Sequence, residues 1–307
     1  MPSVGNVRGK YTFYGLISIL IWSTSSAVIR TLSEQMGIFT SGLITGLLSG
    51  LFGVALGCKT GEIKRLHKAP KSFWAVCLPA YLIYRISAML SICTAATRQQ
   101  VIATGLLRDL WPVTTMVFFL ILYQAKADWR LILCITLSCF GAIIANADFQ
   151  TLCSGTSSSL PSSLFAVLSS LAWGAYSTFA GKSQGGYIYF AVCMLFSGLL
   201  SGILLLVYPE TYSSVTLRAC IEILYSGFVV IFIATIFWNL SLRKGNSLLV
   251  ICLSNYVPVI TVFLSSALLG TLPAKQVVFG SILIIAGTLF GQSSVISSKT
   301  DWKSPPS

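Results

Sequence analysis

Apolar residues run through this chain in long blocks that short polar stretches interrupt. A helix needs about 20 mostly apolar residues to cross the hydrocarbon core of a bilayer. Ten blocks come near this length, and the alternating pattern of a membrane barrel strand is absent. We therefore predict an all-α integral membrane protein with ten transmembrane helices. The predicted spans are Tyr11–Ile29, Ile38–Gly57, Trp74–Ala95, Val101–Tyr123, Trp129–Asn146, Ser162–Ala180, Tyr187–Tyr208, Cys220–Leu240, Asn246–Gly270 and Gln276–Gly291.

The chain divides into two similar halves. The Ser-rich stretch "TLCSGTSSSLPSS" predicts a linker at residues 149–161, between repeats at 8–148 and 162–294. "LLRDLWPVTT" (106–115) aligns with "CLSNYVPVIT" (252–261), which matches Pro112 with Pro258 and Asp109 with Asn255. Five crossings per half would insert the second half upside down. Inverted repeats are typical of secondary transporters, although an old duplication in another kind of membrane protein would leave the same pattern.

Charge sets the predicted orientation. The chain is 55% hydrophobic and 9% charged, with a mean hydropathy of +0.84, which is too apolar for a soluble domain. With a cytoplasmic N-terminus, 14 Lys and Arg residues fall on the cytoplasmic side and 4 on the other. Both termini are therefore expected in the cytoplasm of a multi-pass protein of the cell inner membrane. The first span follows Arg8 and Lys10 but lacks a small-residue cleavage site, so we expect it to be retained.

Three charged residues lie deep inside predicted spans, away from the span ends: Arg85, Arg108 and Asp109. At a rise of about 1.5 Å per residue, they fall near one level, slightly outside the midplane. Each charge facing lipid would cost about 2.5–3.5 kcal/mol. We therefore expect them to face the interior, with Arg85 paired to Asp109, or both in a triad with Arg108. A buried ion pair that only locks two helices together is the structural alternative.

A polar cavity would account for these charges. Pro112 removes a helical donor beside them, and it and Pro258 are predicted helix breaks. Excess positive charge suits a carboxylate, Asp109 suits a cationic group, and aromatic faces suit a flat ring. The predicted substrate-binding residues are Arg85, Arg108, Asp109, Trp22, Tyr84, Trp111, Trp173 and Asn255. Trp238, Trp74 and Trp129 are interpreted as interfacial anchors.

Four stretches carry a family resemblance: "GLISILIWSTSSAVIRTLSEQMG" (15–37), "AATRQQVIATGLLRDLWP" (95–112), "LAWGAYSTF" (171–179), and "FWNLSLRKGN" (237–246) with "SNYVPV" (254–259). Together they resemble the drug/metabolite transporter superfamily with EamA-type halves, and in particular its aromatic amino acid exporters of the YddG type. The resemblance covers nearly the whole chain. It implies a basket of ten helices around a central cavity and alternating access by rocking of the halves.

The chain departs from these exporters at its charges. In the exporters the two positions before "LWP" are neutral or aromatic and the position of Arg85 looks acidic, whereas this chain has Arg108, Asp109 and Arg85. The superfamily also includes importers that exchange S-adenosylmethionine for S-adenosylhomocysteine, and the changed charges favour such a solute. We therefore expect S-adenosylmethionine/S-adenosylhomocysteine exchange. Export of Phe, Tyr or Trp is the first alternative, and broad drug or metabolite efflux is the second.

Other function classes fit less well. No HExxH, GxSxG, P-loop or paired-carboxylate arrangement points to an enzyme. A channel would need rings of like charge from symmetric subunits. The nine cysteines include no CxxC pair, so neither a disulfide framework nor a metal site is expected. We expect no enzyme activity, cofactor or nucleic-acid partner, and a monomer that contacts the lipid bilayer and a small-molecule metabolite.

Overall fold

The computed structural model describes residues 4–123, 129–146, 160–183, 186–210, 216–246, 250, 253–254 and 256–297. Within these ranges every regular element is a helix, which confirms the all-α prediction. The elements before residue 150 are α1 (Val4–Ser23), α2 (Ser25–Met36), α3 (Ile38–Thr60), η1 (Glu62–Lys68), η2 (Phe73–Cys77), α4 (Leu78–Cys93), α5 (Arg98–Arg108), α6 (Trp111–Tyr123) and α7 (Trp129–Asn146). Those after it are α9 (Leu160–Ser183), α10 (Gly186–Val207), α11 (Leu217–Leu224), η3 (Tyr225–Ile233), α12 (Ala234–Lys244), α14 (Val257–Leu269) and α15 (Lys275–Ser297).

The helices are long enough for a membrane protein. Among the described residues, seven helical stretches have the length and apolar composition to cross a bilayer. Three shorter apolar helices, Ile132–Ala145, Val257–Leu269 and Lys275–Gly287, fall within the other predicted spans. The total of ten crossings therefore stays a prediction.

Within the described part of the first half, two predicted spans are interrupted. The first breaks at Thr24, whose hydroxyl bonds back to the Ile21 carbonyl at 2.7 Å, and α2 then continues to Met36. The fourth breaks at Asp109 and Leu110, between α5 and α6. Pro112 lies in the first turn of α6, where a missing N–H costs nothing. One unbroken helix was expected at the first span, so the pattern of hydrophobic residues did not locate the break at Thr24.

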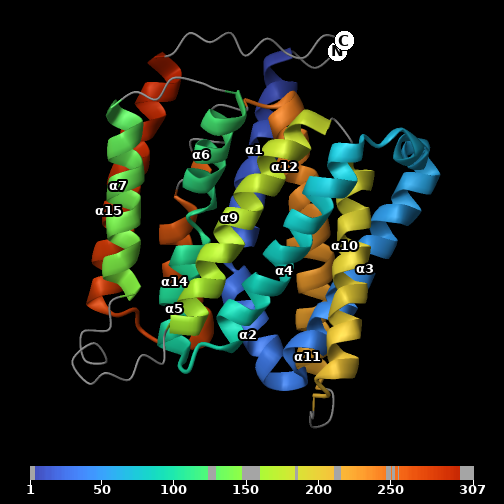
Figure 1. Cartoon of the computed structure of the whole chain (residues 1–307), viewed down its shortest axis with the longest axis horizontal. Helices are drawn as coiled ribbons and strands as arrows, with labels where there is room; N and C mark the ends of the chain where they lie inside the picture. The colour runs from blue at the N-terminus through green and yellow to red at the C-terminus, as the bar shows by residue number, and fades with distance from the viewer. Residues whose placement is uncertain are drawn as a thin grey trace.

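Helices from the two halves pack against one another in pairs. α7 lies along α15 at one side of the bundle (Figure 1), and α3 lies along α10. α4 packs on α9, α1 on α12 and α5 on α14. Each of these pairs joins a helix of the first half to a helix of the second.

Small residues allow the closest of these approaches. At the crossing of α3 and α10, a Cβ on Gly46 would lie 2.6 Å from the Cα of Gly198. Real Cβ atoms do not come this close to another backbone. Membrane helices commonly use such small residues to approach each other, because lipid provides no hydrophobic drive for helix association.

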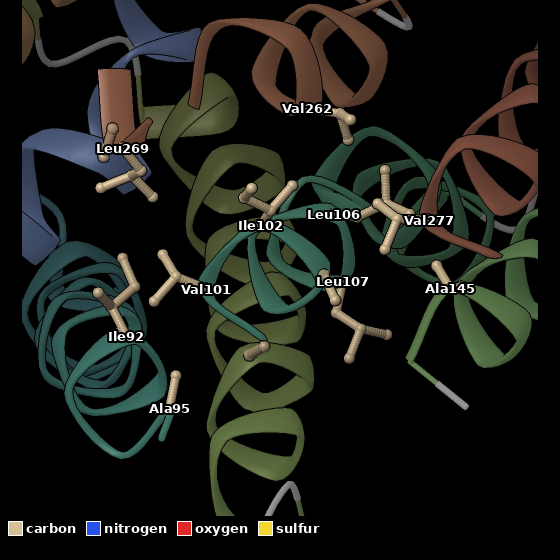
Figure 2. Packing of buried hydrophobic residues seen from close by; sticks show 14 of the residues in the cluster. Ile92, Ala95, Val101, Ile102, Leu106, Leu107, Ala145, Val262, Leu269 and Val277 are labelled. Carbon is tan, nitrogen blue, oxygen red and sulfur yellow. The ribbon is translucent and has the colours of Figure 1, made fainter. Parts of the chain in front are cut away.

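α5 lies at the centre of the bundle. All eight residues from Val101 to Arg108 are buried. Figure 2 shows its side chains Val101, Ile102, Leu106 and Leu107 surrounded by residues of α4, α7, α14 and α15. A helix that is apolar on every side belongs inside a protein. This packing carries the C-terminal end of α5, with Arg108, into the interior of the bundle.

Charged residues also tie the bundle together at the end where α2 stops. Glu34 contacts Arg30 at 2.6 Å and Arg98 at 2.7 Å, and thereby joins α2 to the start of α5. The carboxylate of Glu210 accepts hydrogen bonds from the free backbone N–H groups at the start of α3, including that of Ile38 at 2.7 Å. Glu222 binds Arg218 at 2.8 Å. These acids are therefore engaged in structural contacts.

The crossing at Gly46 gives a test of the packing. Gly46→Ala is expected to destabilise the protein by about 1–3 kcal/mol, because the added methyl group forces two backbones apart. Gly9→Ala is the matched control: nothing lies within 4 Å of that site, so only the higher helix propensity of alanine remains. Thermal unfolding in detergent measures both. Equal unfolding temperatures for the two variants would contradict the tight crossing.

Candidate functional site

Arg108 joins the two interrupted helices. Its Nη2 donates to the hydroxyls of Ser25 at 2.9 Å and Ser26 at 2.8 Å, the first residues of α2 after the break at Thr24. The same nitrogen lies 3.4 Å from Oδ1 of Asp109. Arg108 is 6% exposed and Asp109 4% exposed, so the pair is buried. One guanidinium thus connects the break after α1 with the break after α5.

Arg85 has no such partners. It lies on α4 and is 9% exposed, yet its Nε is buried without a hydrogen bond to any described residue. The predicted pair between Arg85 and Asp109 is wrong, and so is the triad, because Asp109 pairs with Arg108 instead. The turn after α5 brings these two neighbouring side chains together and leaves the guanidinium of Arg85 without a counterion among the described acids.

The carboxylate of Asp109 is only half used. Oδ1 faces Arg108, whereas Oδ2 is buried without a hydrogen bond. The hydroxyl of Thr261, on α14, lies close enough to the carboxylate to interact with it and has no other partner among the described residues. A buried acceptor without a partner is costly. Asp109 can therefore accept a hydrogen bond from a group that enters this region.

Tryptophan rings gather beside the charged residues. The ring centroid of Trp22 lies 6.4 Å from that of Trp111 and 6.3 Å from that of Trp173. Tyr84 approaches Trp173 to 4.6 Å. Trp22 is also held by a hydrogen bond from its Nε1 to the carbonyl of Val230, at 3.1 Å. These rings come from four different helices, so their proximity is a product of the tertiary fold.

Trp238 belongs to the same group of rings. Its centroid lies 5.3 Å from that of Trp22 and 6.0 Å from that of Trp111. The interpretation of Trp238 as an interfacial anchor is therefore wrong: hydropathy placed it near the end of a span, but the helix α12 turns the ring toward α1. Trp74 and Trp129 are 40% and 63% exposed, and their role as anchors stays a prediction.

Seven predicted site residues share one cavity. The cavity offers about 80 Å³ to the centres of water molecules and is partly open to the outside. Its lining includes Trp22, Tyr84, Arg85, Arg108, Asp109, Trp111 and Trp173. Asn255 lies outside the described residues. Pro258 is buried in the first turn of α14, next to Val257, which lines the cavity.

Sequence reasoning missed several lining residues. Ser25 lines the cavity and accepts a hydrogen bond from Arg108, and Ser26 accepts another from the same guanidinium. The sequence signal for these serines was the run of hydroxyl residues "STSS" (23–26), which directly follows the cavity residue Trp22. Tyr81 also lines the cavity. It precedes Arg85 by four residues, and such residues share a helix face.

The pairing in the cavity predicts how charge removal affects stability. Asp109→Asn leaves Arg108 buried without its carboxylate and is expected to cost about 3–5 kcal/mol, as one-sided loss of buried ion pairs does. Combining it with Arg108→Gln restores most of that stability, because no lone charge remains. Arg85→Gln costs nothing or stabilises, since it breaks no ion pair. Thermal unfolding of the four proteins in detergent measures these effects.

The opposite order would contradict this pairing. If Arg85→Gln destabilises as strongly as Asp109→Asn, and their double variant recovers, then Asp109 pairs with Arg85 in the membrane. If all variants unfold at the same temperature, water in the cavity screens the charges and none of the pairs matters for stability.

Comparison with known proteins adds the family context. Residues 9–147 and 160–291 match the EamA-like transporter family. The chain is 25% identical over 287 residues to the aromatic amino acid exporter YddG of Escherichia coli (strain K12), covering 92% of this chain and 96% of the exporter. The exporter YddG of Salmonella typhimurium is also 25% identical, over 91% of this chain and 96% of its own length. A solved crystal structure superimposes with a TM-score of 0.68 at 19% identity, over 92% of this chain and 98% of that one.

Proposed function

This chain belongs to the EamA-like transporter family, and we propose that it carries an amino acid with a flat aromatic ring through the cavity between its halves. The family and the similar exporters are transporters rather than enzymes. The protein is accordingly a multi-pass membrane transporter of a small molecule. The solute, the direction and the mechanism below are our proposals.

The observation that carries the proposal is the chemistry of the cavity. Arg85 lines the cavity as a buried cation without an ionic partner, and Asp109 lines it as a buried carboxylate with only one oxygen engaged. An α-amino acid has both complements, a carboxylate and an ammonium group. Trp22, Trp111 and Trp173 provide aromatic faces for a ring. Arg108 already has Asp109 as a counterion, whereas Arg85 has none among the described acids, so we assign the solute carboxylate to Arg85.

We now rank an aromatic amino acid first among the candidate solutes and S-adenosylmethionine second. The similar exporters carry aromatic amino acids by name, and an indole or phenyl ring fits the same contacts as adenine. S-adenosylmethionine remains the second candidate, because its sulfonium cation would gain from the grouped tryptophan rings through cation–π attraction. No described contact favours broad efflux over these two.

Transport would proceed by alternating access between two inverted repeats. The packing supports this arrangement, because the partners recur after exchange of the halves: α4 on α9 corresponds to α12 on α1. Helix interruptions next to the cavity, at Thr24 and at Asp109, suit a site at the centre of a transporter. We retain residues 8–148 and 162–294 as the two repeats, with ten crossings.

The proposed topology has a direct test. Reporter fusions after Ser307 and within residues 153–160 are expected to report opposite sides of the membrane, because five proposed crossings lie between these two positions. A fusion after Lys126 should agree with the one after Ser307. Cytoplasmic signals are expected for these two, in an inner-membrane protein with more Lys and Arg on that side. One common side for all three fusions would rule out inverted repeats.

The solute is tested by competition in proteoliposomes. For an aromatic amino acid, unlabelled phenylalanine and tyrosine should displace labelled tryptophan, whereas indole and adenosine, which lack the amino-acid end, should not. Arg85→Gln should weaken tryptophan binding by about 1.5–3 kcal/mol, the value of a hydrogen bond to a charged group. Arg65→Gln, which removes an exposed charge paired with Glu62, is the matched control.

The same assay decides between the candidates. Strong displacement by S-adenosylhomocysteine with weak displacement by tyrosine would select the adenosyl solute. Equal displacement by indole and by tryptophan would show that the amino-acid end is not recognised, and the assignment of Arg85 would then be wrong.

A further inference from the structure

Arg85 is the buried cation of the cavity that lacks an anionic partner. Its side chain lines the cavity from α4, the residue is 9% exposed, and its Nε makes no hydrogen bond. The neighbouring guanidinium of Arg108 is neutralised by Asp109 and further bound by two serine hydroxyls. Two arginines and one carboxylate line the cavity, so the charges in its wall sum to one excess positive charge.

The other acids of the described chain are engaged away from the cavity. Glu34 binds Arg30 and Arg98, and Glu62 binds Arg65. Glu210 accepts the backbone N–H groups of α3, and Glu222 binds Arg218. None of these four lines the cavity. Neutralisation of Arg85 by another described side chain is therefore excluded in this conformation.

An arginine side chain stays protonated in proteins, so Arg85 cannot become neutral by losing its proton. An unpaired cation within a membrane span is costly, and such groups are normally found paired or hydrated. The cavity is partly open, so solutes from one side can reach it. A small anion is the simplest counterion that can enter there and leave again during transport.

We propose that the solute-free transporter binds one small inorganic anion of the chloride class at Arg85. The anion contacts the terminal nitrogens of the Arg85 guanidinium, which lines the cavity, and it offsets the excess charge there. The anion and the carboxylate of the solute then bind the same guanidinium in turn, so they compete. This competition rests on the proposed function. Asp109 takes no part in anion binding, because it repels a negative charge.

Thermal unfolding of the purified protein in detergent tests this site without any transported solute. Chloride is titrated against gluconate at constant ionic strength, so that only the smaller anion changes. A ligand that binds the folded state alone stabilises it in proportion to the logarithm of its concentration above Kd. We expect the Tm to rise by about 5 °C over the chloride titration, following the logarithm of the chloride concentration, and not to rise in gluconate.

Variants locate the anion. Arg85→Gln should abolish the chloride-dependent rise, and its Tm in gluconate should equal or exceed that of the unaltered protein. Arg85→Lys keeps the charge and should retain a chloride-dependent rise of the Tm. Arg65→Gln removes an exposed arginine elsewhere and should leave the rise unchanged. An identical Tm in chloride and gluconate for the unaltered protein would overturn the proposal, since water alone then solvates Arg85. A chloride-dependent rise that survives in Arg85→Gln would also overturn it.

Transport kinetics give a second readout that needs no variant. Chloride should raise the KM for labelled tryptophan several-fold with an unchanged kcat, as expected for competition at one group. A lower kcat at constant KM would place the anion elsewhere and overturn the proposal. If no amino acid is transported at all, the proposed function fails, while the chloride-dependent Tm of the unaltered protein still decides whether the anion site exists.

Discussion

A bilayer provides no partners for polar groups, and this constraint applies to the two helix breaks described in the first half. Polar side chains beside a break must be satisfied by other parts of the protein within hydrocarbon. Arg108, at the end of α5, donates to the hydroxyls of Ser25 and Ser26 at the start of α2, so polar side chains at the two breaks satisfy one another. Thr24 adds a contact of 2.9 Å to the hydroxyl of Tyr225 on η3. The cavity exists where these interrupted elements join.

Continuous helices form the frame around this junction. α3 and α10 run side by side without interruption, and so do α7 and α15 (Figure 1). Glycines at the crossing of α3 and α10 bring the two backbones close enough for extensive dispersion contact. α5 fills the interior with side chains that are buried on every side (Figure 2). The charged end of α5 is thus positioned by apolar packing, and electrostatics only determines how its charges are paired.

The cavity separates two kinds of polar group that look alike in the sequence. Arg108 is paired with Asp109 and bound to two serines through its Nη2, whereas Arg85 has no ionic partner among the described acids and the Oδ2 of Asp109 has no hydrogen bond. The tryptophan rings extend the surface on which a flat solute can lie. We infer from this division that recognition depends on the unsatisfied groups, because only they gain new partners when a solute or an anion enters.

Local pattern determined much of this protein. Long apolar blocks suffice to predict helices that cross a membrane, since only regular hydrogen bonding is tolerated there. The cost of charge in lipid was enough to direct Arg85, Arg108 and Asp109 to the interior, and they do line one cavity with Trp22, Tyr84, Trp111 and Trp173. Pro112 marked the break before α6 through its missing donor.

Tertiary structure alone decided which of these groups are partners. Asp109 pairs with Arg108 rather than Arg85, and Trp238 lies against Trp22 rather than at an interface. Depth along a helix is readable from residue spacing, but the rotation of one helix against another depends on the packing of many side chains at once. The break at Thr24 likewise depends on contacts to residues far away in the chain, such as Tyr225. Residue spacing therefore gives the level at which a side chain lies, and only the packed bundle determines what it faces.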